Sequence, residues 1–384
     1  MDFELTKEQL MFQNMAREFA EREIKPVVKE DDRNEYYRPE LMHKMASLGL
    51  VGGIIPPEYG GLGFDNITSA VIVEEIGRVN FSCVVSSFMI QVGLIELTLL
   101  NFGTKEQKET YLPRFVAGEL LGCLGAVEPN VGSDAGAAET TATPDKDGWV
   151  INGSKSMITN AGVADIAIIL AQTDKSKGTR GLATFLVDTK TPGFTTREIK
   201  KLGIRSTNTA DITLDYCHIP KENLVGEIGR GLRVTLSAID NARFAMSAGC
   251  VGIAQACIDA SVKYAQERQQ FNRPIGGFQL IQEMIADMIV ETETARYLVY
   301  RVGYLRDKGL PYFRETAMAK YYTSKVAMQA ADRAIEIHGG YGYSTDFTVE
   351  RYYRDARVAP LFGGTNEIQK LIIAQQALGI SAFT

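Results

Sequence analysis

Apolar side chains recur at helical spacing through the first part of the chain. Between Thr6 and Pro26 they fall three or four residues apart, as on one face of an α-helix. Thr6 with Gln9 three residues later fits a capping box, and Pro26 ends the pattern. A long helical run is also predicted over 66–102, and Thr104 begins a further helix. The first 120 residues are therefore predicted to be helical.

The pattern changes near residue 121, where the apolar runs become short and rich in β-branched residues. The Asn152-Gly153 pair is a hairpin signal. Strands are predicted over 166–171, 182–187 and 211–216, and later helices over 231–268, 278–308, 312–338 and from 366. An order of all-α, all-β and all-α predicts an α+β fold with segregated domains. The predicted domains cover 1–120, 121–228 and 229–384.

Composition narrows the function classes. The 384 residues are 45% hydrophobic and 23% charged, as in ordinary globular proteins. The net charge of −6 gives no general attraction to nucleic acid, and no uninterrupted apolar run reaches the ~18 residues of a membrane span. Five scattered cysteines and three histidines suggest neither a disulfide framework nor a metal site. Without a leader-like N-terminal pattern, we expect a cytoplasmic protein.

Five short motifs could carry chemistry. They cover 128–134, 153–160, 268–279, 338–343 and 362–368. Glycines beside hydroxyl groups and backbone donors let a phosphate or a ring edge approach closely. An Arg and an aromatic residue three positions apart share one face of a helix end, and a helix N-terminus can bind an anion. Each motif alone also fits an ordinary turn or helix end.

Taken in this order, the motifs resemble those of the acyl-CoA dehydrogenase family of flavoproteins. The matching segments are EPxxGSD, NGxKxxIT, RxxF…FQ, GGxGY and GTxEI, and they span essentially the whole chain. The resemblance implies a helical N-terminal domain, a middle β domain and a C-terminal four-helix bundle. It also implies a homotetramer built as a dimer of dimers, bound FAD, a CoA thioester substrate and an electron-transfer flavoprotein as acceptor.

The resemblance assigns roles residue by residue. Around the flavin ring it places Ala126, Val127, Ser133, Met157 and Thr159. Near the FAD of a neighbouring subunit it places Arg268, Phe271, Gln279, Glu336 and Gly340, with Thr365 and Glu367 on the adenosine side. For the CoA thioester it indicates Ser133, Asp240, Arg243 and Gly364. Three positions depart from the family pattern: Glu336 replaces a usual Gln, Met157 a usual aromatic residue and Val127 a usual hydroxyl residue.

The larger departure concerns the catalytic base. Most family members remove the substrate α-proton with the Glu of a Tyr-Glu-Gly-Thr motif, whereas this chain has Gly363 at that position. Other members keep the base one residue before the Arg of the CoA-binding segment, where this chain has Ala242. Both familiar bases are therefore absent.

Three explanations compete. The first is a 1,4-elimination on a cyclic, already unsaturated thioester, as in the cyclohex-1-ene-1-carboxyl-CoA dehydrogenases of anaerobic aromatic metabolism, which this chain resembles. Those enzymes carry an Asp base at or near the position of Gln91, so Gln91 is expected to face the substrate or to mark a removed base. Glu96, five residues on, is expected to point elsewhere. The second explanation is an enoyl-CoA reductase or a lyase, and the third is a CoA-ester-binding subunit with little activity.

Overall fold

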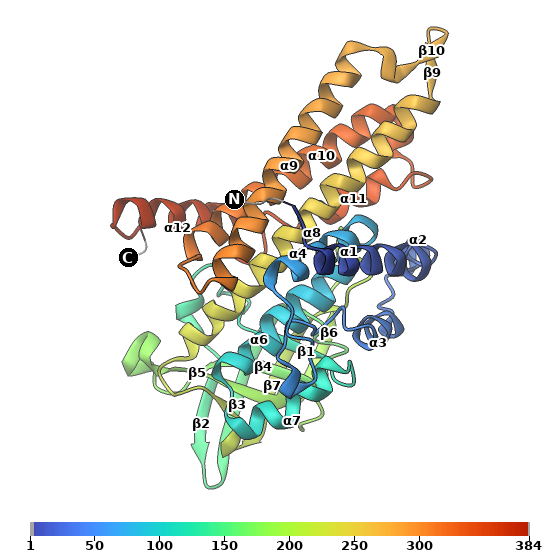
Figure 1. Ribbon diagram of the computed structural model, residues 1–384. Helices are drawn as coiled ribbons and strands as arrows, with labels where there is room; N and C mark the ends of the chain where they lie inside the picture. The colour runs from blue at the N-terminus through green and yellow to red at the C-terminus, as the bar shows by residue number, and fades with distance from the viewer. Residues whose placement is uncertain (1–3, 383–384) are drawn as a thin grey trace.

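Three blocks of secondary structure follow one another along the computed structural model, which describes residues 4–382 (Figure 1). The first block contains α1 (Lys7–Phe19), η1 (Ala20–Ile24), α2 (Val28–Asn34), α3 (Pro39–Ser47), η2 (Pro57–Tyr59), α4 (Asn66–Val79), α5 (Phe81–Cys83), η3 (Val84–Glu96), α6 (Leu97–Phe102) and α7 (Lys105–Val116). The predicted capping boxes at Thr6 and Thr104 are both formed.

The middle block is a single mixed sheet with short 3-10 turns. Its elements are β1 (Gly122–Gly125), η4 (Ala135–Ala137), β2 (Thr141–Asp145), β3 (Gly148–Thr159), β4 (Ile166–Gln172), η5 (Lys175–Gly181), β5 (Leu182–Asp188), β6 (Phe194–Glu198), β7 (Thr209–Pro220), η6 (Lys221–Asn223) and β8 (Leu224–Val225). The strand order is β6-β7-β3-β2-β4-β5-β8, with β1 parallel to β4. The three predicted strands correspond to β4, β5 and β7.

The last block is helical, and the predicted α+β fold is confirmed. It contains α8 (Gly231–Glu267), β9 (Gln269–Gln270), β10 (Arg273–Pro274), η7 (Ile275–Gly277), α9 (Gln279–Asp307), α10 (Phe313–His338), η8 (Gly339–Tyr343), α11 (Val349–Ala356) and α12 (Asn366–Leu378). The β9–β10 hairpin projects from the far ends of α8 and α9 (Figure 1). The short helix α11 gave no clear signal in the sequence.

The Asn152-Gly153 pair is not a hairpin turn, so that prediction was wrong. Both residues lie inside β3, where the pairing with β7 shifts register. Gly153 has a φ of +149°, and a Cβ there would lie 2.6 Å from Oγ1 of Thr140. A dipeptide that tolerates unusual backbone angles suits a β-bulge as well as a turn. The observed turn precedes Gly148 instead.

The helical run predicted over 66–102 is broken at Asn80. Asn80 has extended backbone angles, and its side chain accepts a hydrogen bond from the backbone N–H of Ser82. A new helix therefore starts there, and from Val84 to Glu96 it adopts π geometry with i→i+5 hydrogen bonds. This change of helix type matters for the site, because it alters which side chains share a face.

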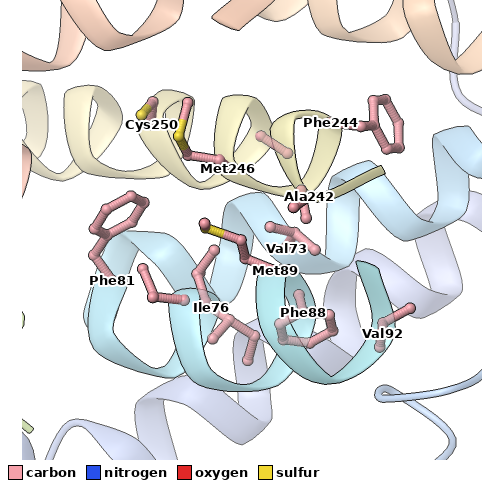
Figure 2. Close-up of a cluster of buried hydrophobic side chains, with 14 of the residues drawn as sticks. Val73, Ile76, Phe81, Phe88, Met89, Val92, Ala242, Phe244, Met246 and Cys250 are labelled. Atoms are coloured by element: carbon pink, nitrogen blue, oxygen red, sulfur yellow. The ribbon is translucent and has the colours of Figure 1, made fainter. Parts of the chain in front are cut away.

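Helix α8 is the element around which the helical blocks pack. It lies against α4, η3, α9 and α10, and bulky apolar side chains fill the spaces beside these contacts (Figures 1 and 2). The crossing with α4 requires glycine, because a Cβ at Gly252 would lie 2.4 Å from the carbonyl oxygen of Glu74. At Gly93 of η3, a Cβ would lie 3.0 Å from Cα of Ala242. These backbones approach so closely that the side chains at 93 and 252 must be absent.

Two helical stretches are long and apolar enough to cross a membrane by length and composition. They are Phe81–Phe102 and Gly231–Glu267, and the most apolar 18 residues of each have mean hydropathies of 1.9 and 1.3. Within the protein, 83% and 72% of these 18-residue segments are buried. Their apolar surface is therefore used against each other and their neighbours, as in the core helices of globular domains.

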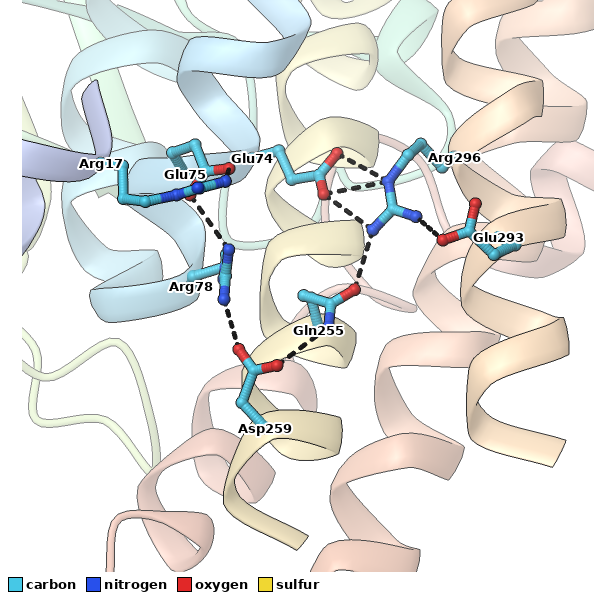
Figure 3. Close-up of polar contacts among 8 residues, drawn as sticks. All are labelled: Arg17, Glu74, Glu75, Arg78, Gln255, Asp259, Glu293 and Arg296. Carbon is cyan, nitrogen blue, oxygen red and sulfur yellow. Dashed lines mark hydrogen bonds and ion pairs between the residues drawn. The ribbon is translucent and has the colours of Figure 1, made fainter. Parts of the chain in front are cut away.

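A network of seven charged side chains and one amide joins four helices (Figure 3). Its members are Arg17, Glu74, Glu75, Arg78, Gln255, Asp259, Glu293 and Arg296. Arg296 of α9 donates from Nη2 to Glu74 of α4 at 2.9 Å, and Arg17 of α1 donates to Glu75 at 2.7 Å. Glu74 is almost fully buried, and burial raises its pKa in spite of Arg296. The carboxylate can stay ionised there only while the guanidinium remains in place.

Arg296→Met is expected to lower the free energy of unfolding by about 3–5 kcal/mol, because it strands the buried Glu74 carboxylate. Denaturant unfolding monitored by far-UV circular dichroism measures the effect. Arg22→Met, which removes an exposed partner of Glu18, should change it by less than about 1 kcal/mol. An Arg296→Met protein as stable as the unmodified one would show that Glu74 is already neutral.

Candidate active site

A bulge in β3 shapes the first wall of the site. The pairing of β3 with β7 shifts between Lys155 and Ile158, and Met157 in the bulge has a φ of +58°. Met157 and Thr159 line a cavity of about 350 Å³. The opposite wall comes from the loop before β7 and from the end of α11, with Lys200, Lys201, Leu202, Gly203, Ile204, Arg354, Arg357, Val358, Leu361 and Phe362. Two residues that the resemblance assigns to the flavin therefore share one cavity.

A buried ion pair fixes the loop that follows β1. Lys155 Nζ lies 2.6 Å from Glu128 Oε1, and both side chains are almost completely buried. Glu128 also accepts hydrogen bonds from the backbone N–H groups of Glu139 at 2.7 Å and Thr140 at 3.0 Å. Burial lowers the pKa of Lys155 to about 8, and Glu128 opposes that shift. The pair holds the 126–133 loop against the bulged segment of β3.

The predicted flavin residues of that loop lie at different depths. Ala126 is buried, Val127 is 39% exposed and Ser133 is exposed. The carbonyl oxygen of Val127 accepts a hydrogen bond from the backbone N–H of Ser156 at 3.0 Å. Loop and bulge are thus joined by a backbone bond as well as by the Glu128–Lys155 pair, which places both segments on one side of the cavity.

A second cavity of about 600 Å³ lies between the end of α8 and η8. It brings Arg268, Glu336 and Gly340 together from segments about 70 residues apart in the sequence. The Arg268 guanidinium stands 5.5 Å from the ring centroid of Tyr341. His338 is buried and stacks on Tyr264 with ring centroids 4.2 Å apart, and burial lowers its pKa. A basic group, aromatic faces and a glycine turn suit a nucleotide.

Two predicted FAD residues are not gathered into this cavity. Phe271 is 87% exposed on the β9–β10 hairpin, where its ring packs edge-to-face with Phe278, and Gln279 begins α9 outside the lining. Their assigned place is beside the FAD of a neighbouring subunit. That role stays a prediction for both residues.

The loop between α11 and α12 is held by its carbonyl oxygens. Arg243 Nε donates to the carbonyl of Gly363 at 2.7 Å, and Gln369 Nε2 donates to that of Gly364 at 3.0 Å. Both glycines have positive φ angles, +64° and +84°. Among residues 4–382, neither of their backbone N–H groups has a hydrogen-bond acceptor. Two preorganised donors are therefore free to polarise a ligand oxygen.

A buried lysine also anchors the end of the same loop, where α12 begins. Lys320 is fully buried, and its Nζ donates to Asn366 Oδ1 at 2.9 Å. Burial lowers the pKa of Lys320 to about 8. Thr365 caps α12 by accepting from the backbone N–H of Ile368, and Glu367 lies in the first turn of that helix. The end of the loop is thus fixed independently of any ligand.

The α8 residues assigned to the thioester lie beside this loop. Asp240 is buried with Arg243 at 3.7 Å and Arg306 at 3.4 Å, yet its Oδ1 has no hydrogen-bond partner in the described chain. Burial raises the pKa of Asp240. Asp240 thus offers a buried acceptor without a partner one helical turn from Arg243, and such an acceptor suits a ligand N–H, as in a pantetheine arm.

Gln91 does not face the substrate as predicted. It is fully buried and its amide is turned to β1: Oε1 accepts from the N–H of Gly122 at 2.9 Å, and Nε2 donates to the carbonyl of Leu120 at 3.3 Å. Nε2 also donates to Glu96 Oε1 at 3.2 Å. The residue therefore ties η3 to the sheet, and its polar groups are used by the protein itself.

The expectation that Glu96 points elsewhere was also wrong. In an α-helix, five residues turn by about 500°, which would leave Glu96 roughly 140° away from Gln91. The π geometry of η3 bonds residues five apart, so the two side chains meet. Burial raises the pKa of Glu96 to about 8, and its Oε2 has no partner among the described residues. No sequence signal indicated this, because helix type is not visible in the apolar spacing.

At the two positions that the resemblance assigns to the base, the chain has Ala242 and Gly363, neither of which carries a carboxylate. Ala242 is buried against Gly93. At Gly363, a Cβ would have its closest contacts at 3.7 Å, to Arg243 Cγ, and 3.9 Å, to Met246 Sδ. A Cβ therefore meets no collision at Gly363, although the φ of +64° strains any side chain there. The residues that the structure describes also contain no cluster of three metal-ligating side chains.

Comparison with known proteins matches this arrangement. The chain fits three family models, the N-terminal, middle and C-terminal domains of acyl-CoA dehydrogenase, over residues 6–119, 123–217 and 229–378. Acryloyl-CoA reductase (NADH) of Anaerotignum propionicum is 42% identical over 382 residues, or 98% of this chain and 96% of that protein.

Solved structures of other proteins share the fold of this chain over nearly its whole length. Butyryl-CoA dehydrogenase from Megasphaera elsdenii has a TM-score of 0.96 at 38% identity, over 98% of this chain and 100% of that one. A chain in a structure concerning the electron transferring flavoprotein of Acidaminococcus fermentans has a TM-score of 0.97 at 39% identity, with the same coverage.

Lys155→Met is expected to destabilise the protein by about 3 kcal/mol or more, because it leaves Glu128 buried without its cation. Thermal unfolding of the FAD-loaded protein and the rate of FAD release both measure the effect, and release should become faster as the 126–133 loop loosens. Lys146→Met, at an exposed position, serves as the control. Unchanged stability and release would contradict the anchoring role.

Glu96→Gln is expected to change the pH dependence of stability. A carboxyl with a pKa of about 8 when folded and about 4.3 when unfolded loses about 1.4 kcal/mol of stability per pH unit as the pH rises between those values. The variant should lack this slope between pH 5 and 8. Denaturant midpoints at each pH test it, with the exposed Glu18→Gln as control. Parallel curves for the variant and the unmodified protein would show that Glu96 is ionised.

Proposed function

The chain belongs to the acyl-CoA dehydrogenase family, and on that premise we propose that it oxidises an acyl-CoA thioester that already carries a double bond. At the level of the family, it is an FAD-dependent oxidoreductase acting on CH–CH bonds of acyl-CoA. To this family-level activity the proposal adds that the acyl group is already unsaturated and that its γ-carbon, not its α-carbon, loses the proton. Cyclohex-1-ene-1-carboxyl-CoA is the first substrate to test.

One observation carries the proposal: the site retains the groups that polarise a thioester but lacks the carboxylate that removes an α-proton. Gly363 and Ala242 stand where family members place the base. The backbone donors of Gly363 and Gly364 stay free, and Arg243 holds their loop. A reaction that needs carbonyl polarisation without an α-base fits these residues.

A cyclic enoyl thioester meets that requirement. Its γ-proton is acidic, because the charge left behind is delocalised onto the thioester oxygen. Loss of that proton, with hydride leaving from the other allylic carbon, completes a 1,4-elimination. The reaction therefore needs a proton acceptor, from a side chain or from water, on a wall other than the Gly363 loop. Gln91 cannot supply it, because an amide does not accept a proton at neutral pH and its groups are already bound.

The residues around the first cavity would hold the flavin ring. Thr159 and Met157 line it on the β3 side, and the Ala126–Ser133 loop is anchored beside them. Arg268, Glu336 and Gly340 would hold the nucleotide end of the FAD of a neighbouring subunit, with Thr365 and Glu367 on the adenosine side. When bound, FAD supplies the acceptor for the hydride. An electron-transfer flavoprotein would take the electrons onward, which the likeness to the Acidaminococcus fermentans structure supports. A homotetramer is the proposed assembly.

A reductase is the second candidate. Acryloyl-CoA reductase (NADH) of Anaerotignum propionicum is a relative of this chain, and reduction of an enoyl thioester could draw its α-proton from water instead of from a protein carboxyl group. Such an enzyme would oxidise its own reduced flavin when given an enoyl-CoA. Oxidation of the reduced flavin by an enoyl-CoA therefore distinguishes the reductase from the proposed dehydrogenase.

The experiment that tests the proposal follows flavin absorbance without oxygen. Cyclohex-1-ene-1-carboxyl-CoA is expected to bleach the flavin of the unmodified protein, and butyryl-CoA is not. Gly363→Glu should make bleaching by butyryl-CoA at least about 100-fold faster, because it puts a carboxylate where the resemblance places the α-base and a Cβ meets no collision there. Gly363→Gln introduces a side chain of the same shape that cannot accept the proton, so butyryl-CoA should bleach its flavin no faster than that of the unmodified protein.

Two outcomes would contradict the proposal. Rapid bleaching of the unmodified protein by butyryl-CoA would show that an α-base exists elsewhere. Failure of every thioester to bleach the flavin, with reoxidation by acryloyl-CoA, would favour the reductase. The positive φ at Gly363 costs a side chain there about 1–2 kcal/mol, which both variants share.

A further inference from the structure

The loop between α11 and α12 is closed at its base by the chain itself. The backbone N–H of Asn366 donates to the carbonyl oxygen of Pro360 at 2.9 Å. Behind this closure lies the Lys320 side chain of α10, whose Nζ is 2.9 Å from Asn366 Oδ1 and 3.4 Å from the Pro360 carbonyl oxygen. The free backbone N–H groups of Gly363 and Gly364 belong to the segment between these two ends. Lys320 is therefore bonded directly to the turn that presents both donors.

No acidic side chain neutralises the Lys320 ammonium. It is fully buried, both of its hydrogen-bond acceptors are uncharged, and no carboxylate among residues 4–382 forms an ion pair with it. From α8 it is faced by Arg243, which is itself positive, and by Cys250, a thiol that stays neutral because burial raises its pKa to about 12. The facing carboxylate, Glu367, is exposed in the first turn of α12. Buried charges in proteins are normally paired, so this one requires an explanation.

Positive charge therefore gathers around one turn of the chain. Arg243 donates from Nε to the Gly363 carbonyl oxygen at 2.7 Å, and the 13-residue helix α12 begins at Asn366. Arg243 has Asp240 as a counter-ion at 3.7 Å, whereas Lys320 has none among the described residues. A helix N-terminus and a desolvated cation both favour negative charge beside them. Lys320 thus supplies the surplus positive charge at this loop.

Negative charge develops on the thioester oxygen in the proposed reaction. As the γ-C–H bond breaks, the proton passes to its acceptor and the electron pair is shared with that oxygen. A buried cation behind the donors to this oxygen stabilises the charge strongly, because water does not screen it and the protein need not rearrange. A thioester that stays neutral gains little from the same cation.

We propose that Lys320 is a positioning residue whose charge, acting through the loop that it holds, stabilises the negative charge on the thioester oxygen. The inference rests on the proposed function, since it takes a CoA thioester whose carbonyl oxygen lies at the N–H groups of Gly363 and Gly364. It does not depend on which carbon loses its proton. A thioester that ionises without being oxidised can therefore test it.

Acetoacetyl-CoA is the probe, because it loses an α-proton to water and forms an enolate with no redox step. The ultraviolet absorbance of the enolate, followed in the FAD-loaded protein as the pH rises, gives the ratio of enolate to neutral bound thioester. Lys320→Gln keeps a donor for Asn366 and removes the charge, so this ratio should fall at least about tenfold, or one pKa unit. The affinity for butyryl-CoA, which stays neutral, should not change. Lys325→Gln, at an exposed position of the same helix, is the matched control and should alter neither quantity.

The pH profile of the unmodified protein gives a second readout. Burial lowers the pKa of Lys320 to about 8, so its charge is present below pH 8 and is lost above it. The charges of Arg243, Cys250 and Glu367 do not change over this range. Just above pH 8, the enolate ratio should therefore rise by less than the ordinary factor of about ten per pH unit, whereas in Lys320→Gln it should keep that factor throughout.

Three results would overturn the inference. The first is an enolate ratio in Lys320→Gln equal to that of the unmodified protein. The second is a loss confined to Lys320→Met, because that variant differs from Lys320→Gln in the hydrogen bond to Asn366 and not in charge. The third is an equal loss in Lys325→Gln, which would assign the effect to net charge. If Lys320→Gln fails to hold FAD, an undiminished slope above pH 8 in the unmodified protein would refute the inference by itself.

The outcomes also separate this inference from the proposed function. Ionisation of acetoacetyl-CoA that depends on Lys320, without bleaching of the flavin by any thioester, would keep the role of Lys320 and refute the proposed reaction. Bleaching by cyclohex-1-ene-1-carboxyl-CoA, together with ionisation that does not depend on Lys320, would keep the reaction and overturn the role of Lys320.

Discussion

The close contact of α8 with α4 and η3 is the constraint on which the rest of the structure depends. Backbone meets backbone at Gly252 and Gly93, where any Cβ would collide with the facing helix. Because the helices are this near, apolar side chains beside the contacts are buried almost completely, and the charged ones must find partners (Figures 2 and 3). The position of α8 then fixes Asp240 and Arg243, and through Arg243 the loop at Gly363.

The candidate site is built mainly from backbone groups that side chains hold in place. Arg243 and Lys320 bind the loop between α11 and α12 through carbonyl and amide oxygens, which leaves its N–H groups free. On the other side, the Glu128–Lys155 pair holds a loop against a bulge. Such a site can polarise a thioester without a base of its own. In the proposed reaction, the lack of a carboxylate at Gly363 and Ala242 removes the α-proton step and leaves polarisation of the thioester to these backbone groups.

Burial of ionisable groups connects the fold to the site. Glu96, Lys155 and Lys320 all have pKa values that burial moves toward neutrality. Each stands where two blocks of the chain meet or where a loop is anchored, and none is exposed. Lys155 joins its two segments through an ion pair with Glu128, whereas Lys320 and Glu96 bond to uncharged groups. The stability of the protein and the geometry of the site therefore both depend on the protonation of Glu96, Lys155 and Lys320.

The sequence by itself determined the order of helical and β parts, the capped helix starts at Thr6 and Thr104, and the lack of a carboxylate at residues 242 and 363, because these depend on local spacing and residue identity. It could not determine that Asn152-Gly153 forms a bulge or that η3 is a π-helix, because both depend on partners distant in the chain. For the same reason Gln91 and Glu96 were misplaced. Only the tertiary structure decided that Arg268, Glu336 and Gly340 share a cavity, since their positions follow from how α8 and α10 pack.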